Sequence, residues 1–195
     1  MNSTNMTLEY YNRNAADFTA ATLNVDFQEN QNRFLKMLNR GDLILDFGCG
    51  GGRDSKYFLS RNYKVSAIDG SKEMCRLASE YAKIYVKNIE YKDFSDTSIY
   101  DGIWANASLV HLDDNNLLST LSSIREALKD DGVFYMSLKN NKSERESDRD
   151  RIFYYRSFDE VYSMIRYLDF ELEEYYNSVC KRDIVWDNYI LKKEM

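Results

Sequence analysis

Four of the eight glycines in the chain fall within residues 48–52, directly after an apolar run at Leu43–Phe47. Glycine tolerates left-handed backbone and lets a ligand come close to the main chain. A loop that follows a buried strand in this way lies at the carboxyl edge of a sheet, where doubly wound α/β proteins bind ligands. Asp46, two residues before the first glycine, would suit a cationic ligand and would repel a pyrophosphate.

The spacing of these glycines excludes two common nucleotide motifs. The dinucleotide fingerprint GxGxxG needs a third glycine where this chain has Arg53, and a P-loop needs GKS or GKT after its glycines. What remains is an acidic residue followed by GxGxG, formed here by Gly48, Gly50 and Gly52.

Asp69 directly follows the second apolar run, Tyr63–Ile68, and lies 17 residues after Gly52. An acid at this place typically accepts hydrogen bonds from a ribose diol. The two features together predict a nucleoside-type cofactor with positive charge, and S-adenosylmethionine carries both a sulfonium and an ammonium. The alternative is purely structural, a glycine turn followed by an aspartate that caps a helix.

Four segments of the chain resemble the conserved motifs of class I S-adenosylmethionine-dependent methyltransferases: Leu43–Arg53, Ile68–Ser71, Lys92–Phe94 and Tyr100–Leu112. Gly132–Leu138 is similar to the strand that follows these motifs. The resemblance covers about residues 10–190 and is nearest to small bacterial enzymes of the tellurite-resistance type and to generic small-molecule methyltransferases. It implies a Rossmann-like fold, S-adenosylmethionine as cofactor and S-adenosylhomocysteine as product.

The resemblance also implies a set of cofactor-binding residues. Asp69 would bind both ribose hydroxyls, Asp93 would accept from the adenine amino group, and Asn106 would lie near the transferable methyl. The full set is Tyr11, Asp46, Gly48, Gly50, Arg53, Asp69, Gly70, Met74, Asp93, Phe94, Asn106 and Ala107. Tyr11 and Arg53 would face the cofactor carboxylate, and Gly70 and Met74 would flank the adenine. For Tyr11, Met74 and Phe94 simple packing is the alternative.

Methyl transfer from a sulfonium is an in-line displacement that an enzyme promotes mainly by alignment. A base is needed only when the acceptor carries a proton at reaction, and His111, five residues after Asn106, is the candidate base. Packing at a helix entry is its alternative role. Together with Asn106, His111 and Lys139 form the predicted catalytic set. By resemblance, acceptor contacts come from Lys139, Arg145, Arg151, Trp186 and Asn188.

The apolar pattern alternates between short strand-like runs and longer helical ones. It predicts strands at Leu43–Phe47, Tyr63–Ile68, Ile84–Tyr91, Asp101–Ala105, Val133–Leu138, Phe170–Ser178 and Asp183–Leu191. It predicts helices at Arg53–Ser60, Ser71–Tyr81, Asp114–Leu128 and Phe158–Leu168, with a turn at residues 130–132.

Strands joined by single helices form a parallel sheet, and the short connection between the last two strands makes that pair antiparallel. We therefore expect one α/β domain over residues 1–195, with a Rossmann-like, doubly wound, mostly parallel seven-stranded sheet that ends in an antiparallel hairpin. Residues 1–40, with an amphipathic stretch at Phe27–Leu38, form an N-terminal helical lid on the core of residues 41–195. The charged segment Asn140–Arg151 is either a solvated loop or part of a lid.

The composition and charge of the chain limit the classes of partner and the location that we expect for it. A net charge of -6 disfavours a nucleic-acid binder, and no apolar run reaches the roughly 18 residues of a membrane helix. Residues 1–7 lack the features of a signal peptide, so we expect a cytoplasmic protein that is a monomer or a homodimer. Three cysteines and one histidine exclude a disulfide framework and a multi-histidine metal site. We expect a small-molecule acceptor, with an anionic one favoured by the basic residues. Two alternatives stay open: a cofactor-binding protein without methyl transfer, and a methyltransferase acting on protein or RNA.

Overall fold

The computed structural model describes residues 3–140, 145–148, 151–179 and 184–194. Seven strands form one sheet in the order β3-β2-β1-β4-β5-β9-β8. The strands of this sheet are β1 (Leu43–Phe47), β2 (Lys64–Asp69), β3 (Val86–Asn88), β4 (Tyr100–Ala105), β5 (Leu128–Asn140), β8 (Phe170–Val179) and β9 (Val185–Lys193). Cys180 and the predicted strand start at Asp183 lie outside the described residues.

The sheet is mostly parallel, as the sequence predicts. β1 lies between β2 and β4, with Ile44 opposite Val65 on one side and Gly102 on the other. β4 pairs with β5 in parallel, whereas β5–β9 and β8–β9 are antiparallel pairs. The predicted fold class is therefore confirmed, including the antiparallel hairpin at the end of the chain.

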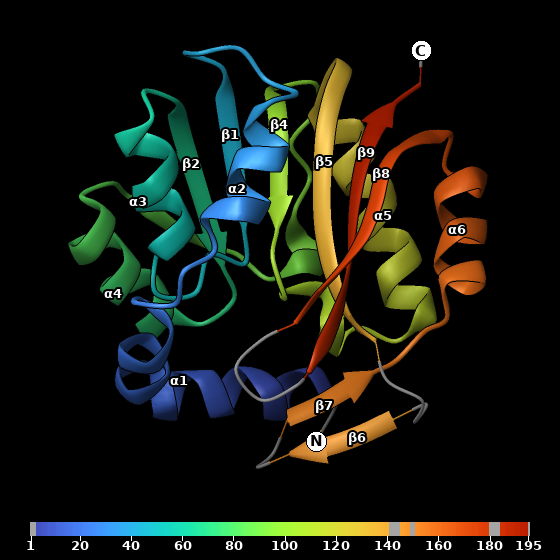
Figure 1. Ribbon diagram of the computed structural model, residues 1–195. Coiled ribbons are helices and arrows are strands. Elements are labelled where there is room, and N and C mark those ends of the chain that lie inside the picture. Colours follow the sequence, from blue (N-terminus) through green and yellow to red (C-terminus); the bar gives the residue numbers. More distant parts are fainter. Residues whose placement is uncertain (1–2, 141–144, 149–150, 180–183, 195) are drawn as a thin grey trace.

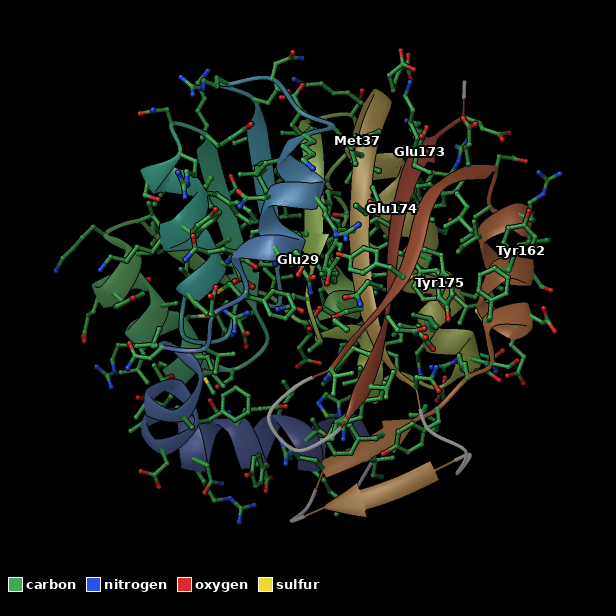
Figure 2. All side chains as sticks on the ribbon, viewed as in Figure 1. Glu29, Met37, Tyr162, Glu173, Glu174 and Tyr175 are labelled. Carbon is green, nitrogen blue, oxygen red and sulfur yellow. The ribbon has the colours of Figure 1, made fainter. Side chains whose placement is uncertain are left out.

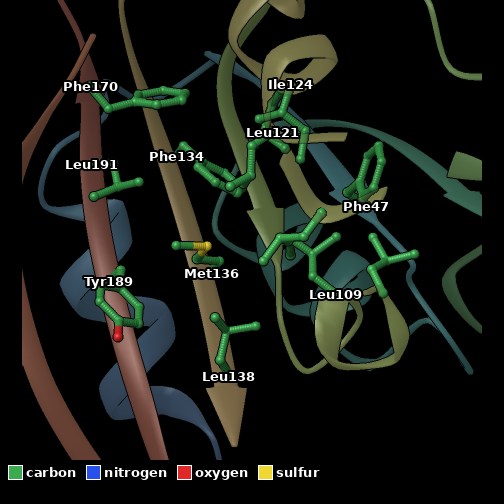
Figure 3. Close-up of a cluster of buried hydrophobic side chains, with 14 of the residues drawn as sticks. Phe47, Leu109, Leu121, Ile124, Phe134, Met136, Leu138, Phe170, Tyr189 and Leu191 are labelled. Atoms are coloured by element: carbon green, nitrogen blue, oxygen red, sulfur yellow. The ribbon is translucent and has the colours of Figure 1, made fainter. Parts of the chain in front are cut away.

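Helices cover both faces of the sheet (Figure 1). Side chains alternate along a strand, so Ile44 packs on one face and Leu45 on the other. The Ile44 face is covered by α2 (Gln28–Leu35) and α3 (Arg53–Ser60), while α5 (Asp114–Ala127) and α6 (Phe158–Tyr167) cover the opposite face. The hydrophobic core on the Leu45 face, under α5 and α6, includes Leu121 and Ile124 of α5 together with Phe134 and Met136 of β5 (Figure 3).

The lower edge of the sheet in Figure 1, where the parallel strands end, is covered by α1 (Ser3–Thr22) and by a small hairpin. This hairpin pairs β6 (Arg145–Asp148) with β7 (Arg151–Tyr154). The charged segment that the sequence leaves as a loop or lid thus contains strand structure in its described part. β7 contacts α1 and the short 3-10 helix η2 (Leu109–His111), so the hairpin belongs to the cover of this edge.

Two element boundaries differ from the prediction. β3 has only three residues and is followed by a 3-10 helix, η1 (Tyr91–Asp93), whereas the sequence predicts one longer strand over Ile84–Tyr91. β5 begins at Leu128, because the predicted turn at residues 130–132 is an irregularity within the strand, with left-handed Asp131. The helix before β3, α4 (Lys72–Ala82), has its predicted N-cap, since the Ser71 hydroxyl accepts from the Met74 amide.

The N-terminal segment is anchored to the sheet through α2. Phe34 is fully buried against Phe58 and Trp104, with ring centroids 5.9 and 5.3 Å away. Arg33 forms ion pairs with Glu29 of α2 and with Glu174 of β8. Both glutamates are labelled in Figure 2. Along the stretches that the structure describes, we find no helix both long and apolar enough to cross a bilayer.

Replacing Phe34 tests this anchor. We expect Phe34→Ala to lower the free energy of unfolding by about 3–5 kcal/mol, because it leaves a cavity between α2 and the sheet. Met37, labelled in Figure 2, follows the same helix but is 41% exposed. Met37→Ala should therefore change the free energy of unfolding by less than about 0.5 kcal/mol. Urea denaturation of both variants gives the comparison, and equal losses would contradict the anchoring role of α2.

Candidate functional site

A cavity of about 310 Å³ lies between the glycine loop, α1 and the segments that follow β2, β3 and β4. Most of the predicted site residues line it: Tyr11, Gly48, Gly50, Arg53, Asp69, Gly70, Met74, Asn106, Ala107 and His111. Asp46, Asp93, Phe94 and Lys139 are not in its wall. The segments that line this cavity lie far apart in sequence, and the fold brings them to one edge of the sheet.

The glycine loop passes close to its neighbours at one end and leaves room at the other. Gly48 and Gly50 both have left-handed backbone, with φ of 78° and 54°. A Cβ on Gly48 would lie 2.4 Å from the Tyr91 hydroxyl, whereas a Cβ on Gly50 would meet nothing within 4 Å. The main chain at Gly50 is therefore open to a ligand in the cavity.

Asp69 faces this open backbone. Its Oδ2 accepts from the Gly50 amide at 2.9 Å, and its Oδ1 accepts from the Ser71 amide at 2.8 Å. Burial raises the pKa of the Asp69 carboxyl, and the two backbone hydrogen bonds partly offset this effect. Each carboxylate oxygen retains a lone pair for a further donor. Asp69 thus stabilises the backbone at Gly50 and Ser71 and can still accept hydrogen bonds from a diol.

Asp46 lies beneath the loop and away from the cavity. It is 3% exposed and accepts from the Ser55 hydroxyl at 2.6 Å. Burial and the nearby charge of Asp54 raise the pKa of Asp46 to about 8. The geometry does not support the predicted direct contact between Asp46 and a cationic ligand.

Two of the four predicted adenine contacts, Asp93 and Phe94, lie outside the cavity wall. Asp93 is exposed at the end of η1, and Phe94 is buried with its ring 5.1 Å from that of Phe47. Glu90, Tyr91 and Lys92 line the cavity instead. A 3-10 helix occupies Tyr91–Asp93, where the sequence predicts the end of a strand.

Tyr11 and His111 form a hydrogen-bonded pair in the cavity wall. The Tyr11 hydroxyl lies 3.0 Å from His111 Nε2, and His111 Nδ1 lies 2.6 Å from the carbonyl oxygen of Ile152 in β7. Because a carbonyl only accepts, Nδ1 carries the proton, and Nε2 of the neutral ring accepts from Tyr11. The pair thereby joins α1, η2 and β7 at one point.

The surroundings of His111 keep its ring neutral. Burial lowers the pKa of His111 to about 4 against the effect of the Ile152 hydrogen bond, and the charges of Arg151 and Lys139 act in the same direction as burial. A histidine with this pKa is a weak base at neutral pH. The structure therefore weakens the prediction that His111 is a general base and leaves it as a hydrogen-bond acceptor.

Lys139 and Arg151 lie among aromatic rings near His111. Lys139 Nζ is 3.5 Å from the Phe153 ring centroid, and the Arg151 guanidinium is 4.7 Å from that of Tyr10. Lys139 stands opposite Trp186 in the β5–β9 pair. Asn188 is fully buried, where it accepts from the Tyr135 hydroxyl. The Arg145 side chain lies outside the described part of the structure.

Asn106 and Ala107 follow β4 in a constrained loop. Asn106 Oδ1 accepts from the Ser137 hydroxyl at 2.9 Å, and the same hydroxyl accepts from the Ala107 amide at 2.8 Å. Ala107 has left-handed backbone with φ of 54°, which costs a non-glycine residue on the order of 1–3 kcal/mol. The Ser137 hydroxyl holds this loop in place at the cavity.

Asp54 is a cavity residue that the sequence analysis did not single out. Its carboxylate accepts from Arg53, Gln31, Trp104 and Asn106. Burial by itself would raise the pKa of Asp54, but Arg53 and the Trp104 and Asn106 hydrogen bonds outweigh it and hold the pKa below its usual value. Its place directly after Arg53 was the one available signal, and it did not distinguish Asp54 from an ordinary helix residue.

Comparison with known proteins finds a domain match for part of the chain. Residues 44–132 match the family model described as a methyltransferase domain. A protein of Methanocaldococcus jannaschii described as uncharacterised is 30% identical over 135 residues, which is 68% of this chain and 51% of that protein. The chain therefore spans about half the length of this curated relative.

Solved structures share the fold. A 1,6-didemethyltoxoflavin-N1-methyltransferase from Burkholderia thailandensis, with 1,6-didemethyltoxoflavin and S-adenosylhomocysteine bound, has a TM-score of 0.84 at 18% identity and covers 98% of this chain and 89% of its own. Magnesium protoporphyrin IX methyltransferase from Synechocystis PCC 6803, with S-adenosylmethionine bound, has a TM-score of 0.78 at 14% identity, covering 100% and 98%. At these identities the likeness is one of fold.

The pKa of His111 predicts how stability depends on acidity. The pKa of about 4 in the folded chain lies below the ordinary histidine pKa of 6.5, so the unfolded chain binds the extra proton between these pH values. The contribution of His111 to stability is present above pH 6.5 and is lost as the pH falls toward 4. Asp46 has the opposite effect, because its raised pKa makes the folded state hold a proton up to about pH 8.

His111→Asn isolates the histidine from this opposing effect. We expect the unfolding free energy of the wild type, measured by urea denaturation between pH 4 and 7, to fall more steeply toward acid than that of the variant. Parallel curves for the two proteins would show that His111 is not buried in its neutral form.

Proposed function

We propose that this chain is a class I S-adenosylmethionine-dependent methyltransferase that transfers a methyl group from S-adenosylmethionine to an anionic small-molecule acceptor. The sheet topology and the match of residues 44–132 to a methyltransferase domain support this proposal. The observation that carries the proposal is the open main chain at Gly50 in the cavity wall, directly beside the Asp69 carboxylate that accepts from its amide. This arrangement offers both a close backbone approach and two acceptor oxygens.

The residues present fit the cofactor. Asp69 has oxygens available for a ribose diol, and the buried Ser108 hydroxyl in the cavity wall has no hydrogen-bond partner among the described residues. Gly70 and Met74 supply an apolar surface for an adenine. Tyr91 lines the cavity in place of its sequence neighbours Asp93 and Phe94, which the sequence predicts as adenine contacts. When bound, S-adenosylmethionine supplies an electrophilic methyl on a sulfonium.

The other cavity residues have positions that suit binding of the methionine part and alignment of the acceptor. Arg53 offers donors for a carboxylate, in line with the role that the resemblance implies, whereas the Tyr11 hydroxyl already donates to His111. Asn106 and Ala107 lie on the loop after β4, where we place the methyl group. Alignment and exclusion of water account for up to about 7–11 kcal/mol of a transfer barrier in favourable cases.

The charges beside His111 favour an anionic acceptor. Arg151 and Lys139 both act on His111, and together they form a positive region next to the Tyr11–His111 pair. An acceptor that is already an anion presents its nucleophile without a proton transfer. This requirement agrees with a neutral His111 whose Nε2 is occupied by Tyr11, so we assign the pair to closing and shaping the site.

A second candidate is a protein that binds the cofactor and catalyses another reaction. The cyclase SpnF, described as a [4+2]-cyclase, has a TM-score of 0.72 at 14% identity and covers 86% of this chain and 81% of its own. The fold therefore accommodates different chemistry. An assay for S-adenosylhomocysteine formation separates this candidate from a methyltransferase. A net charge of -6 disfavours RNA as the acceptor.

Asp69 provides the test of cofactor binding. We expect Asp69→Ala to weaken S-adenosylhomocysteine binding roughly 10- to 100-fold, because two hydrogen bonds to a charged group are lost. Asp159→Ala is the matched control, since Asp159 is exposed on α6 and outside the cavity wall. Isothermal titration of both variants, with NAD as a second ligand, gives the result. An unchanged affinity in Asp69→Ala, or preferential binding of NAD, would contradict the proposed cofactor.

Lys139 provides the test of the acceptor. Purified protein with S-adenosylmethionine and a panel of small carboxylates, oxyanions and amines should form S-adenosylhomocysteine mainly with the anions, as followed by mass spectrometry. For the preferred anion, Lys139→Ala should lower kcat/KM, because it removes one of the two positive charges beside His111, which lines the cavity. The exposed Lys64→Ala serves as control. Turnover with amines alone would exclude an anionic acceptor.

A further inference from the structure

We propose that Asp54 is a positioning residue for the methyl-transfer site, whose carboxylate sets Arg53 and Asn106 at the cavity and ties both to α2 through Gln31. The inference rests on the proposed function in one respect, since it takes the cavity to be the cofactor site. No motif position predicts this role, and it depends on contacts between four separate segments of the chain.

The Asp54 carboxylate accepts five hydrogen bonds. At Oδ1 the donors are Arg53 Nε at 2.8 Å and Gln31 Nε2 at 2.7 Å. At Oδ2 the donors are Arg53 Nη2 at 3.0 Å, Trp104 Nε1 at 2.9 Å and Asn106 Nδ2 at 3.2 Å. Every group here donates, so only an ionised carboxylate satisfies all of them at once.

The charge of Asp54 is compensated locally. Arg53 forms a two-point ion pair with it, and both side chains are mostly buried, with 20% and 9% exposed. Among the described residues Ser55 alone donates to Asp46, the second buried acid of this region, and Asp46 holds a proton more readily. Of the two acids, Asp54 is thus the one that stays charged.

The first consequence concerns the orientation of Asn106. Its Nδ2 is held by Asp54 and its Oδ1 by the Ser137 hydroxyl, so both ends of the amide are fixed. Ser137 in turn accepts from the amide of left-handed Ala107. Asp54 therefore lies at the start of a hydrogen-bonded chain that shapes the loop after β4.

The second consequence concerns the N-terminal segment. Gln31 of α2 is 2% exposed and does not line the cavity, yet its amide donates to the same oxygen as Arg53 Nε. Phe27, just before α2, lies with its ring centroid 4.9 Å from the Arg53 guanidinium. Docking of α2 on the sheet and the aim of Arg53 into the cavity are thus set by one carboxylate.

Asp54→Asn is the direct test, with S-adenosylhomocysteine as the probe in isothermal titration. The amide cannot accept from all five donors, so Arg53 and Asn106 lose their fixed orientation, and we expect the Kd to rise about 10-fold or more. Asp187→Asn is the matched control. Asp187 is also buried, accepts from Asn140 and Tyr175, and lies outside the cavity wall, so its Kd should stay within about 2-fold of the wild type.

A double-mutant cycle with Asn106→Ala separates positioning from general stability. If Asp54 acts through Asn106, its loss weakens binding much less when Asn106 is already absent, so the two effects are not additive. A lower Tm for Asp54→Asn with an unchanged Kd, or fully additive effects in the cycle, would overturn the proposal.

Trp104→Phe covers the case in which Asp54→Asn does not fold. Trp104 does not line the cavity, and this change removes one donor to Asp54 while keeping an aromatic ring. We expect a several-fold rise in the Kd, and no rise in Phe58→Leu, which reduces the same apolar cluster without touching Asp54. Equal affinities for the wild type and Trp104→Phe would refute the positioning role. Failure of the wild type itself to bind S-adenosylhomocysteine would instead refute the proposed function.

Discussion

A single buried negative charge organises the site of this protein. Asp54 is 6% exposed, and a charge so far from water is tolerated only when it is paired and hydrogen-bonded. Arg53 supplies the pairing, and Gln31, Trp104 and Asn106 supply the remaining donors. Because these groups come from α2, α3, β4 and the loop after β4, satisfying one carboxylate places four parts of the chain relative to one another.

The three acids near the glycine loop differ because their donors differ. Asp54 has an arginine and three neutral donors, and its pKa is lowered. Asp69 has two backbone amides that only partly offset burial. Asp46 has one hydroxyl and the charge of Asp54 nearby, and its pKa rises to about 8. Identical side chains within 24 residues of sequence thus become an anchor, a ligand-facing acceptor and a buried acid that carries a proton.

The opposite wall of the cavity follows the same logic with neutral groups. His111 donates to the Ile152 carbonyl and accepts from Tyr11, so its ring is satisfied without a charge. Burial lowers the pKa of His111, and the positive charges of Arg151 and Lys139 lower it further because they would repel an imidazolium. The β6–β7 hairpin, which contains Ile152, is therefore part of the site. The sequence alone identified most of this hairpin only as a charged segment.

Local patterns in the sequence determined the strand and loop at residues 43–52, the acid at Asp69, the cap at Ser71 and the antiparallel end of the sheet, because each depends on neighbouring residues or on short connections. Tertiary structure decided the rest. Asp54 gains its role from partners 23 and 52 residues away, and Tyr11 meets His111 across 100 residues. Asp93 and Phe94, at the end of a 3-10 turn that the sequence does not predict, lie outside the cavity wall, and burial lowers the pKa of His111. Long-range contacts and burial leave no mark on local sequence, so these features became visible only in the folded chain.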